Sequence, residues 1–260
     1  MTPGQVPITA ADVEFYHREG YFVYNHQVFP PEKFQALKDH FEYLLNHRPE
    51  GKRPEDLDVP HFGDTKLFEW LLSDEVLDLV EPFIGPNIAL WSSHFIAKPG
   101  GGGRAVPWHE DSYLWKGLLE PQEVITLWLA IDDADPENGS MRVIPRTHDN
   151  GFSQYHNVDL NENVFAVELN EDQMDMSRVV DMRLKAGECH FHHAKLMHGS
   201  NANFSNRRRC GYTMRYMSTA VKFVGQDNPN FKHNIYLARG KDLAGNRYGD
   251  PTKVYPELVR

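Results

Sequence analysis

The 260-residue chain has the composition of an ordinary globular protein, with 40% hydrophobic and 25% charged residues. Its net charge of −10 excludes general binding to nucleic acids or anionic membranes, because both require a positive field. Two cysteines, Cys189 and Cys210, define no disulfide framework and favour a reduced compartment. Residues 1–5 lack the basic and apolar regions of a signal peptide, and no apolar run approaches the ~18 residues of a membrane span. We therefore expect a soluble, cytoplasmic protein.

Residues 1–86 are predicted to be mostly helical. Thr9 and Asp12 have the spacing of a capping box, and Gly20 is a plausible end for the first helix. After Pro30-Pro31, apolar residues recur at helical spacing along 34–45, which predicts a second, amphipathic helix. Shorter helices are predicted around residues 67–71 and from Ser73 to Gly85.

From residue 87 onward the pattern changes to short apolar segments separated by turns, which is typical of strands. The candidate strands are residues 88–98, 124–131, 141–144, 164–169, 179–184, 189–193 and 210–221. Helices followed by many strands predict an α+β, mainly β protein with a sandwich or barrel core over residues 87–221. We expect one domain over 1–260, as a monomer or homodimer. Its polar segment 147–178 and its C-terminal extension 222–260 are both candidates for a lid over the pocket.

The segment Trp108-His109-Glu110-Asp111 is a candidate metal site. His-x-Asp with a distant histidine is the ligand set of the 2-His-1-carboxylate facial triad, which binds non-haem Fe(II) and leaves positions open. Alternate residues of a strand face the same side, so His109 and Asp111 can share a metal if 108–111 is extended. His-x-Asp pairs also occur by chance, so the prediction of a metal site depends on the other motifs that accompany this pair.

The distal ligand has several candidates between residues 190 and 198. His190 and His192 would share one strand face and form a site of their own, as in cupin-like proteins, or the histidines could be structural. We favour His198, because Gly199-Ser200 and an arginine-bearing strand follow it.

Arg209 opens that strand, in the run Arg207-Arg208-Arg209. The first two arginines are best explained as a solvated basic turn. An inward-facing Arg209 would be a buried charge, which is costly unless a ligand carboxylate pairs with it in bidentate fashion.

Taken together, these motifs match a known family. The chain resembles the phytanoyl-CoA dioxygenase family of Fe(II)/2-oxoglutarate oxygenases over roughly residues 10–220. The resemblance rests on Lys98-Pro99, on residues 108–111, 126–132, 137–141 and 143–148, on His198-Gly199-Ser200 and on Arg209.

The resemblance implies a double-stranded β-helix (jelly-roll, cupin-like) core with N-terminal helices packed outside. It implies that His109, Asp111 and His198 hold the iron. It further implies that Arg209 and Ser200 hold the far carboxylate of 2-oxoglutarate in a pocket that also involves Trp128, Thr126 and Lys98. The alternative for Lys98 is a strand-end lysine with its ammonium group in water. Glu110 stands where relatives often carry glutamine, and its side chain is expected to point away from the metal.

The predicted activity is Fe(II)-, 2-oxoglutarate- and O2-dependent hydroxylation of an unactivated C–H bond in a small-molecule metabolite, with release of succinate and CO2. Desaturation, epimerisation or ring formation at the same site, and a non-catalytic jelly-roll binding module, are the alternatives. Candidate substrate contacts are His94, Tyr113 and Arg215, although His94 could equally be a satisfied core histidine. No nucleic-acid or membrane partner is expected.

Overall fold

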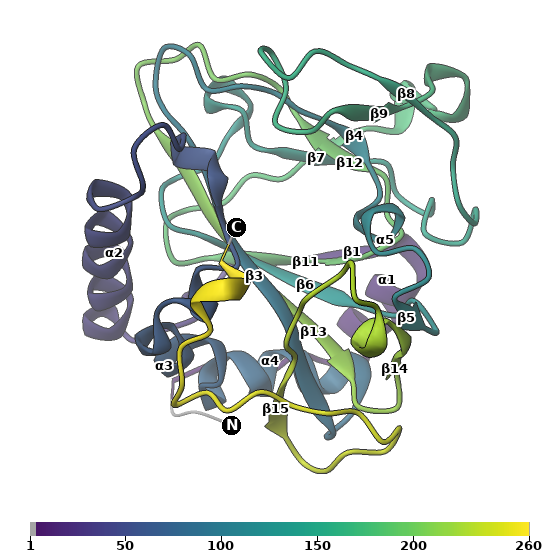
Figure 1. Cartoon of the computed structure of the whole chain (residues 1–260). Coiled ribbons are helices and arrows are strands. Elements are labelled where there is room, and N and C mark those ends of the chain that lie inside the picture. Colours follow the sequence, from purple (N-terminus) through teal and green to yellow (C-terminus); the bar gives the residue numbers. More distant parts are fainter. Residues whose placement is uncertain (1–3, 260) are drawn as a thin grey trace.

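The computed structural model describes residues 4–259, so residues 1–3, part of the N-terminus that is predicted to carry no signal peptide, lie outside the described residues. Two antiparallel sheets form its centre (Figure 1). The larger has the order β1 (Tyr21–Tyr24), β11 (Cys189–His193), β6 (Ile125–Ala130), β13 (Arg209–Ser218), β3 (Ile88–Lys98) and β15 (Tyr236–Arg239), with β2 (Leu57–Asp58) also on β3. The smaller has the order β10 (Val180–Asp181), β7 (Met141–Val143), β12 (His198–Ser200) and β4 (Val106–His109).

Helices cover the larger sheet on the side away from the smaller one (Figure 1). They are α1 (Ala10–Glu19), α2 (Pro31–Asn46), α3 (Phe68–Leu71) and α4 (Asp74–Ile84). The predicted capping box of Thr9 and Asp12 is present, and Gly20 ends α1 with a φ of 81°, which favours glycine. Leu37 and Phe41 of α2 are fully buried in the core cluster that contains Phe95 of β3. All four predicted helices are therefore confirmed.

The strand predictions differ from the structure mainly where a strand is short. β1 lies inside the region predicted to be mostly helical, and β4, β12 and β15 were not predicted. Segment 147–178 contains the hairpin of β8 (Tyr155–Asn157) and β9 (Val167–Leu169), and β5 (Leu119–Glu120) pairs with β14 (Lys222–Phe223). These strands span two to four residues, and their pairing is decided by distant neighbours rather than by local periodicity. Single 3-10 turns lie at Pro54–Asp56, Pro60–Phe62, Thr65–Leu67, Pro136–Asn138, Glu171–Gln173, Met176–Arg178, Val224–Asp227 and Pro256–Leu258.

Sheet register brings the motifs of distant segments together. On the smaller sheet, His198 of β12 lies opposite His109 of β4. On the larger sheet, β13 pairs Arg209 with Lys98 of β3 and Arg215 with Thr126 of β6. The register thus places residues that are far apart in the sequence on neighbouring strands of the two sheets.

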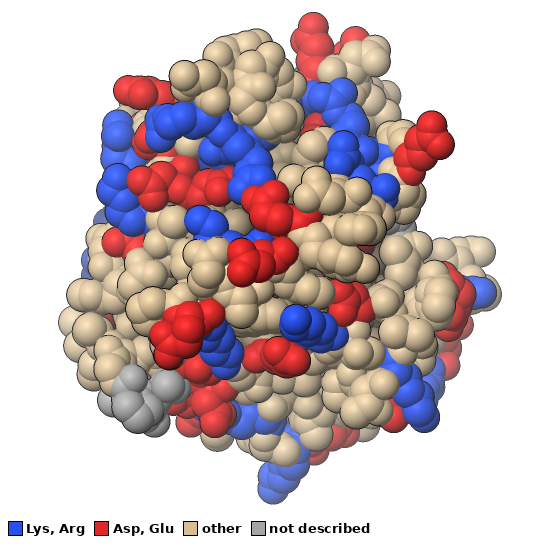
Figure 2. All heavy atoms as spheres, turned by 90° about the vertical axis from the view of Figure 1, so that its left-hand side faces the viewer, with Lys and Arg blue, Asp and Glu red and all other residues tan. Residues whose placement is uncertain are grey.

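Among residues 4–259, no helix is long and apolar enough to cross a membrane. On the face that carries α2, Lys and Arg side chains are interspersed with Asp and Glu (Figure 2).

An ion pair between the largely buried Glu19 and the exposed Arg146 ties α1 to the bend that follows β7. Glu19 Oε1 and Oε2 accept from Arg146 Nη2 and Nε at 2.7 and 2.8 Å, and Arg18 Nε donates to Oε1 at 2.8 Å. These arginines lower the pKa of Glu19 to about 2. A depressed pKa adds stability that is complete above the unfolded value and is lost as the pH falls through the folded value.

Replacing Glu19 with glutamine is therefore expected to destabilise the fold by roughly 1–2 kcal/mol at pH 7 and by progressively less between about pH 4.5 and 2. Urea unfolding at a series of pH values measures this difference. Glu14→Gln, at an exposed position of the same helix, is the control and should change little at any pH. A Glu19→Gln penalty that does not shrink on acidification would contradict the assigned role of the carboxylate.

Candidate metal and co-substrate site

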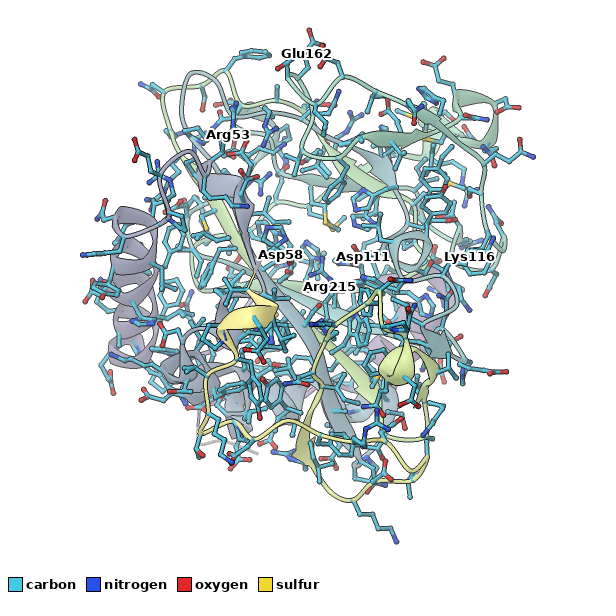
Figure 3. The ribbon with its side chains drawn as sticks, in the orientation of Figure 1. Arg53, Asp58, Asp111, Lys116, Glu162 and Arg215 are labelled. Carbon is cyan, nitrogen blue, oxygen red and sulfur yellow. The ribbon has the colours of Figure 1, made fainter. Side chains whose placement is uncertain are left out.

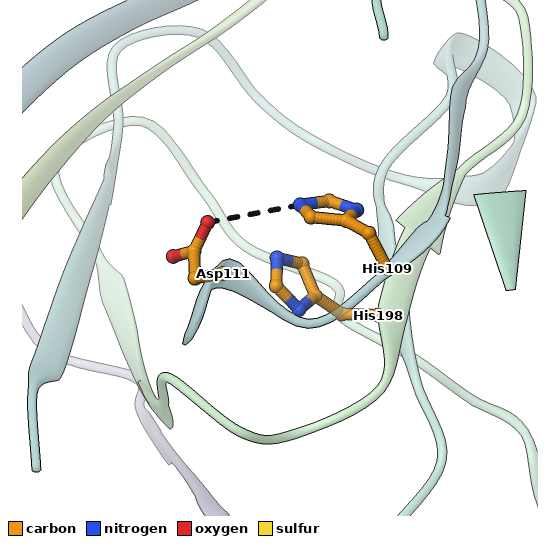
Figure 4. A group of neighbouring side chains, drawn as sticks. All are labelled: His109, Asp111 and His198. Carbon is orange, nitrogen blue, oxygen red and sulfur yellow. Dashed lines mark ion pairs between the residues drawn. The ribbon is translucent and has the colours of Figure 1, made fainter. Parts of the chain in front are cut away.

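His109, Asp111 and His198 meet between the two sheets. One ligand atom from each lies within 4.8 Å of the others, and all three side chains are buried (Figure 4). The strand ends at His109, and Asp111 begins the short helix α5 (Asp111–Leu114), so the predicted extended run to Asp111 is shorter than expected. Glu110 between them remains extended, with φ −113° and ψ 125°, so the Asp111 carboxylate still turns toward His109, with Oδ1 at 3.7 Å from Nε2.

Backbone carbonyls orient both histidine rings. Nδ1 of His109 lies 2.8 Å from the Pro107 oxygen, and Nδ1 of His198 lies 2.8 Å from the Leu196 oxygen. Because a carbonyl only accepts, each Nδ1 carries the proton and each Nε2 presents a lone pair. Burial lowers the pKa of His198 well below its usual value, which keeps the ring neutral. Two neutral nitrogens and a carboxylate are the donor set that suits Fe(II).

Arg215 holds the Asp111 carboxylate in place. Its Nε and Nη2 donate to Oδ2 and Oδ1 at 3.1 and 3.3 Å, and its Nη1 donates to Thr213 Oγ1. Burial opposes ionisation of Asp111, but Arg215 and neighbouring histidines hold its pKa well below the usual range. Arg215 was predicted as a substrate contact. In the structure, three of its donor atoms instead donate to Asp111 and Thr213. The Arg215 side chain also borders two cavities. Thr126, predicted in the co-substrate pocket, places Oγ1 3.5 Å from Asp111 Oδ2.

Arg215→Lys is expected to weaken metal binding by about 10- to 100-fold, the usual cost of losing a group that orients a ligand. Lysine keeps the charge but cannot form the two-point contact, so the variant isolates geometry from electrostatics. Anaerobic titration with Mn(II) as the probe, followed by electron paramagnetic resonance, measures the dissociation constant. Arg239→Lys changes an arginine that pairs with Asp74, Asp78 and Glu81, and it is the matched control. Equal metal affinity in Arg215→Lys and wild type would refute the orienting role.

Two buried cations lie side by side next to the triad. Lys98 is 0% exposed and donates from Nζ to Ser200 Oγ at 2.6 Å, so the alternative of a lysine with its head in water is wrong. Arg209 is 2% exposed and donates to the Gly139 and Ile96 carbonyls at 3.0 and 3.2 Å and to Ser200 Oγ at 3.4 Å.

Within residues 4–259, neither cation forms an ion pair with a carboxylate. Burial lowers the pKa of Arg209 to about 10, and burial together with Arg209 lowers the pKa of Lys98 well below its usual value. Lys98 Nζ also donates to the carbonyl oxygens of Ser200 and Asn201, so the chain itself satisfies its hydrogen-bonding capacity. Arg209 has no carboxylate partner among the described residues, and an anion bound beside it would offset the cost of burying its charge.

A narrow cavity joins Arg209 and Ser200 to the two histidines of the triad. Its lining residues are Ile96, Val106, His109, Trp128, Met141, Phe165, His192, His198, Gly199, Ser200, Arg209, Thr213 and Arg215. The guanidinium of Arg209 lies 5.5 Å above the Trp128 ring, a cation–π contact. Residue 211 is glycine because a β-carbon there would collide with the same ring. Trp128 therefore lies beside Arg209 on the wall of this cavity.

The rival pair His190 and His192 does not form a separate metal site. Among the described residues, the group able to share an ion is His109, Asp111 and His198. His190 stacks on Trp128 with ring centroids 5.3 Å apart, and His192 Nε2 lies 3.8 Å from Asp111 Oδ2. Burial lowers the pKa of both imidazoles, so they form a neutral wall beside the triad.

A larger cavity of about 420 Å³ opens on the other side of Asp111 and Arg215. His94, predicted as a candidate substrate contact, lines this cavity and donates from Nε2 to the Glu55 carbonyl oxygen, 2.8 Å away. Tyr113 lines neither cavity and instead stacks on Tyr155 at 3.7 Å, so the structure gives no support to a substrate contact at this residue.

Segment 147–178 contributes a residue that the sequence did not indicate. Phe165 meets the His109 ring edge-on at 4.9 Å and borders both cavities. Glu110 is fully buried and accepts from Ser153 Oγ at 2.8 Å and Tyr155 Oη at 3.3 Å, so it points away from the metal, toward this segment. The available signal was one of three aromatic residues in a polar stretch, which does not specify a position over the site.

Two features define the class of this protein: a jelly-roll fold, and a 2-His-1-carboxylate group enclosed between its sheets. Residues 16–211 match the model of the family "Phytanoyl-CoA dioxygenase (PhyH)", and the chain belongs to that family. A protein of Stutzerimonas stutzeri named "Probable alpha-ketoglutarate-dependent hypophosphite dioxygenase" is 27% identical over 152 residues, which are 58% of this chain and 52% of that protein. The chain spans about half the length of the curated relatives it matches.

Solved structures confirm the predicted jelly-roll fold. The apo form of the non-heme monooxygenase ThoJ superimposes with a TM-score of 0.73 at 21% identity, covering 93% of this chain and 90% of that one. The "non-heme alpha ketoglutarate dependent carbocyclase SnoK from nogalamycin biosynthesis" gives a TM-score of 0.69 at 19% identity, covering 93% and 98%. At these identities the likeness shows the fold alone.

Proposed function

We propose that the protein is an Fe(II)- and 2-oxoglutarate-dependent dioxygenase that hydroxylates an unactivated C–H bond of a small molecule and releases succinate and CO2. The observation that carries this proposal is the pairing of two features: a buried triad with Fe(II)-type donors, and the buried Arg209, which has no carboxylate partner among residues 4–259 and lines the same cavity as the two triad histidines. A metal-binding site alone would not require the second feature.

The residues present fit both groups. His109, Asp111 and His198 would hold the iron, with Arg215 fixing the carboxylate. Arg209 and Ser200 would bind the far carboxylate of 2-oxoglutarate, and Lys98, which donates to Ser200, would add a second positive charge. When bound, the iron would activate O2: one oxygen atom oxidises 2-oxoglutarate to succinate and CO2, and the other is left to oxidise the C–H bond. The chain's part is to orient the co-substrate and to exclude water with buried residues such as Trp128 and Ile96.

Relatives support the reaction class and leave the outcome open. One relative is named as alpha-ketoglutarate-dependent, and structural neighbours are named monooxygenase and carbocyclase. Hydroxylation is the outcome proposed here, and ring formation, the reaction in the name of one structural neighbour, is the alternative outcome. Both would use the same triad, so only the product distinguishes them.

The proposal is tested by incubating purified protein with Fe(II), 2-oxoglutarate and O2 and measuring succinate. Succinate formation that requires both iron and oxygen is expected, with stimulation by a substrate from a metabolite screen. Mass spectrometry of the stimulating compound then separates a gain of one oxygen from a loss of two hydrogens. No succinate and no binding of 2-oxoglutarate would favour the non-catalytic binding module instead.

A further inference from the structure

Two buried histidines that the proposed function does not use lie next to the triad. His190 and His192 alternate on β11 and are 0% and 1% exposed. Among residues 4–259, neither ring nitrogen of either histidine has a hydrogen-bond partner. Buried polar groups are nearly always paired, and leaving one unpaired costs free energy. Two adjacent imidazoles of this kind therefore call for an explanation beyond packing.

The narrow cavity distinguishes the two rings. His192 lines it together with His198, Trp128 and Arg209. His190 is stacked on Trp128 with an interplanar angle of 10° and is not among the described residues that line the cavity. A molecule bound in this cavity therefore reaches the ring of His192 and not that of His190.

Sheet register places His192 at the triad end of the cavity. His192 of β11 and Arg215 of β13 pair with the same residue, Thr126, from the two sides of β6. Arg209 precedes Arg215 by six residues on β13, so it belongs to the other end. The ring centroids of His192 and His198 are 4.7 Å apart. The cavity thus has His192 beside the metal ligands and Arg209 at its far end.

The Asp111 carboxylate does not satisfy His192. Nε2 of His192 lies 3.8 Å from Oδ2, which is longer than a hydrogen bond. That oxygen already accepts from Arg215 Nε at 3.1 Å, and the two side chains lie together between the sheets in Figure 3. Among the described residues, no backbone carbonyl holds the His192 ring as Pro107 and Leu196 hold the rings of the triad histidines. His192 therefore keeps an unused N–H and an unused lone pair beside the triad.

The ligand expected at this end of the cavity can use that N–H. If the proposed function holds, the 2-oxo acid group of the co-substrate lies at the triad, and its oxygens are all hydrogen-bond acceptors. A neutral imidazole always carries one N–H, so it can donate to such an oxygen. Hydrogen bonds to an ionised acceptor are stronger than those between neutral groups, and this one would offset the cost of burying the ring.

We propose that His192 binds the co-substrate: its imidazole N–H donates to an oxygen of the 2-oxo acid group of 2-oxoglutarate, while Arg209 and Ser200 hold the far carboxylate. This rests on the proposed function, which identifies the narrow cavity as the co-substrate site. His192 fixes the end of the co-substrate that meets the metal. His190 takes no part in the contact.

Two ligands separate the ends of the co-substrate: 2-oxoglutarate, and 2-oxovalerate, in which a methyl group replaces the far carboxylate. Each is titrated anaerobically into the Fe(II)-loaded protein, and the visible charge-transfer band gives the dissociation constant. His192→Leu removes the donor with little change in volume. It is expected to weaken both ligands by about tenfold or more, because both keep the 2-oxo acid group. Arg209→Met should instead weaken 2-oxoglutarate and leave 2-oxovalerate within about twofold.

Two variants and two further measurements separate this role from packing. His192→Gln keeps an N–H near the position of Nε2 and should restore both affinities to within about threefold of the wild type. His190→Leu makes the same change two residues away and should leave both affinities within about twofold. In His192→Leu alone, the band should move to shorter wavelength, because the N–H stabilises electron density that light transfers onto the 2-oxo acid group. Without ligand, thermal unfolding should show His192→Leu to be as stable as the wild type or more stable.

The outcomes separate this proposal from the proposed function. Wild-type affinity of His192→Leu for both ligands would overturn this proposal and leave the proposed function standing. A loss confined to 2-oxoglutarate, an equal loss in His190→Leu, or a ligand-free His192→Leu protein that is less stable than the wild type would also overturn it. No binding of 2-oxoglutarate by the wild type would refute the proposed function and this proposal together.

Discussion

Asp111→Ala is expected to abolish iron-dependent succinate formation and to weaken Mn(II) binding by more than about 100-fold, because losing a ligand costs more than losing a group that orients one. Asp111 is the only carboxylate of the triad, so its loss leaves two neutral imidazoles facing a divalent cation. Anaerobic metal titration and a succinate assay measure the two effects.

The loss of Asp111 has a second consequence that the test must separate. The carboxylate neutralises Arg215, so Asp111→Ala leaves a buried guanidinium without its partner and is expected to lower the stability of the fold. His198→Ala removes a neutral ligand and avoids that penalty, and it should lose activity while remaining folded. Asp227→Ala, at an exposed site, is the control. Wild-type succinate formation in a folded His198→Ala variant would rule out the triad.

Arg209→Met is expected to weaken 2-oxoglutarate binding by roughly 30-fold or more, since truncating one partner of a buried, hydrogen-bonded charge pair costs about 2–5 kcal/mol. The same change should leave the ligand-free protein equally stable or more stable. Arg209 is buried beside Lys98 without an ion-pairing carboxylate among residues 4–259, and a well-packed apolar side chain avoids that cost. Fluorescence titration with 2-oxoglutarate and thermal unfolding without it measure the two effects.

Arg207→Met is the matched control for this prediction. Arg207 lies two residues away, is 43% exposed and pairs with Asp135 at 2.8 Å. Its replacement should leave the affinity for 2-oxoglutarate unchanged. If Arg209→Met destabilised the ligand-free protein while binding 2-oxoglutarate normally, Arg209 would be a structural residue and the anion site would lie elsewhere.

Long periodic elements could be predicted from the sequence, whereas short paired ones could not. The amphipathic pattern of α2 and the eleven-residue strand Ile88–Lys98 carry their own local signal. β12, with three residues, and β1, with four, become strands because β4, β7 and β11 lie beside them. β12 nevertheless carries His198 and Ser200, so a short strand that local periodicity does not predict holds part of the site.

The same distinction between local sequence signals and long-range contacts applies to the site. The sequence indicated the triad and Arg209 through motifs in family order, and the structure brings these residues together. The sequence did not indicate that Arg215 donates hydrogen bonds to Asp111. The position of Arg215, six residues after Arg209 on β13, gives no information about an aspartate at the start of α5. Nor did the sequence indicate that Glu55, Asp56 and Asp58 line the larger cavity, because these residues come from a region predicted to be mostly helical and reach the cavity through β2 and its preceding turn.

The most direct measurement of the central claim is the visible absorption of the anaerobic protein with Fe(II) and 2-oxoglutarate. If the triad holds Fe(II) while Arg209, Ser200 and Lys98 hold the co-substrate against it, a weak charge-transfer band near ~500 nm is expected for the chelate formed on this ligand set. The band should require both additions and should disappear in His198→Ala. Absence of the band in the wild type, with no binding of 2-oxoglutarate, would contradict the account.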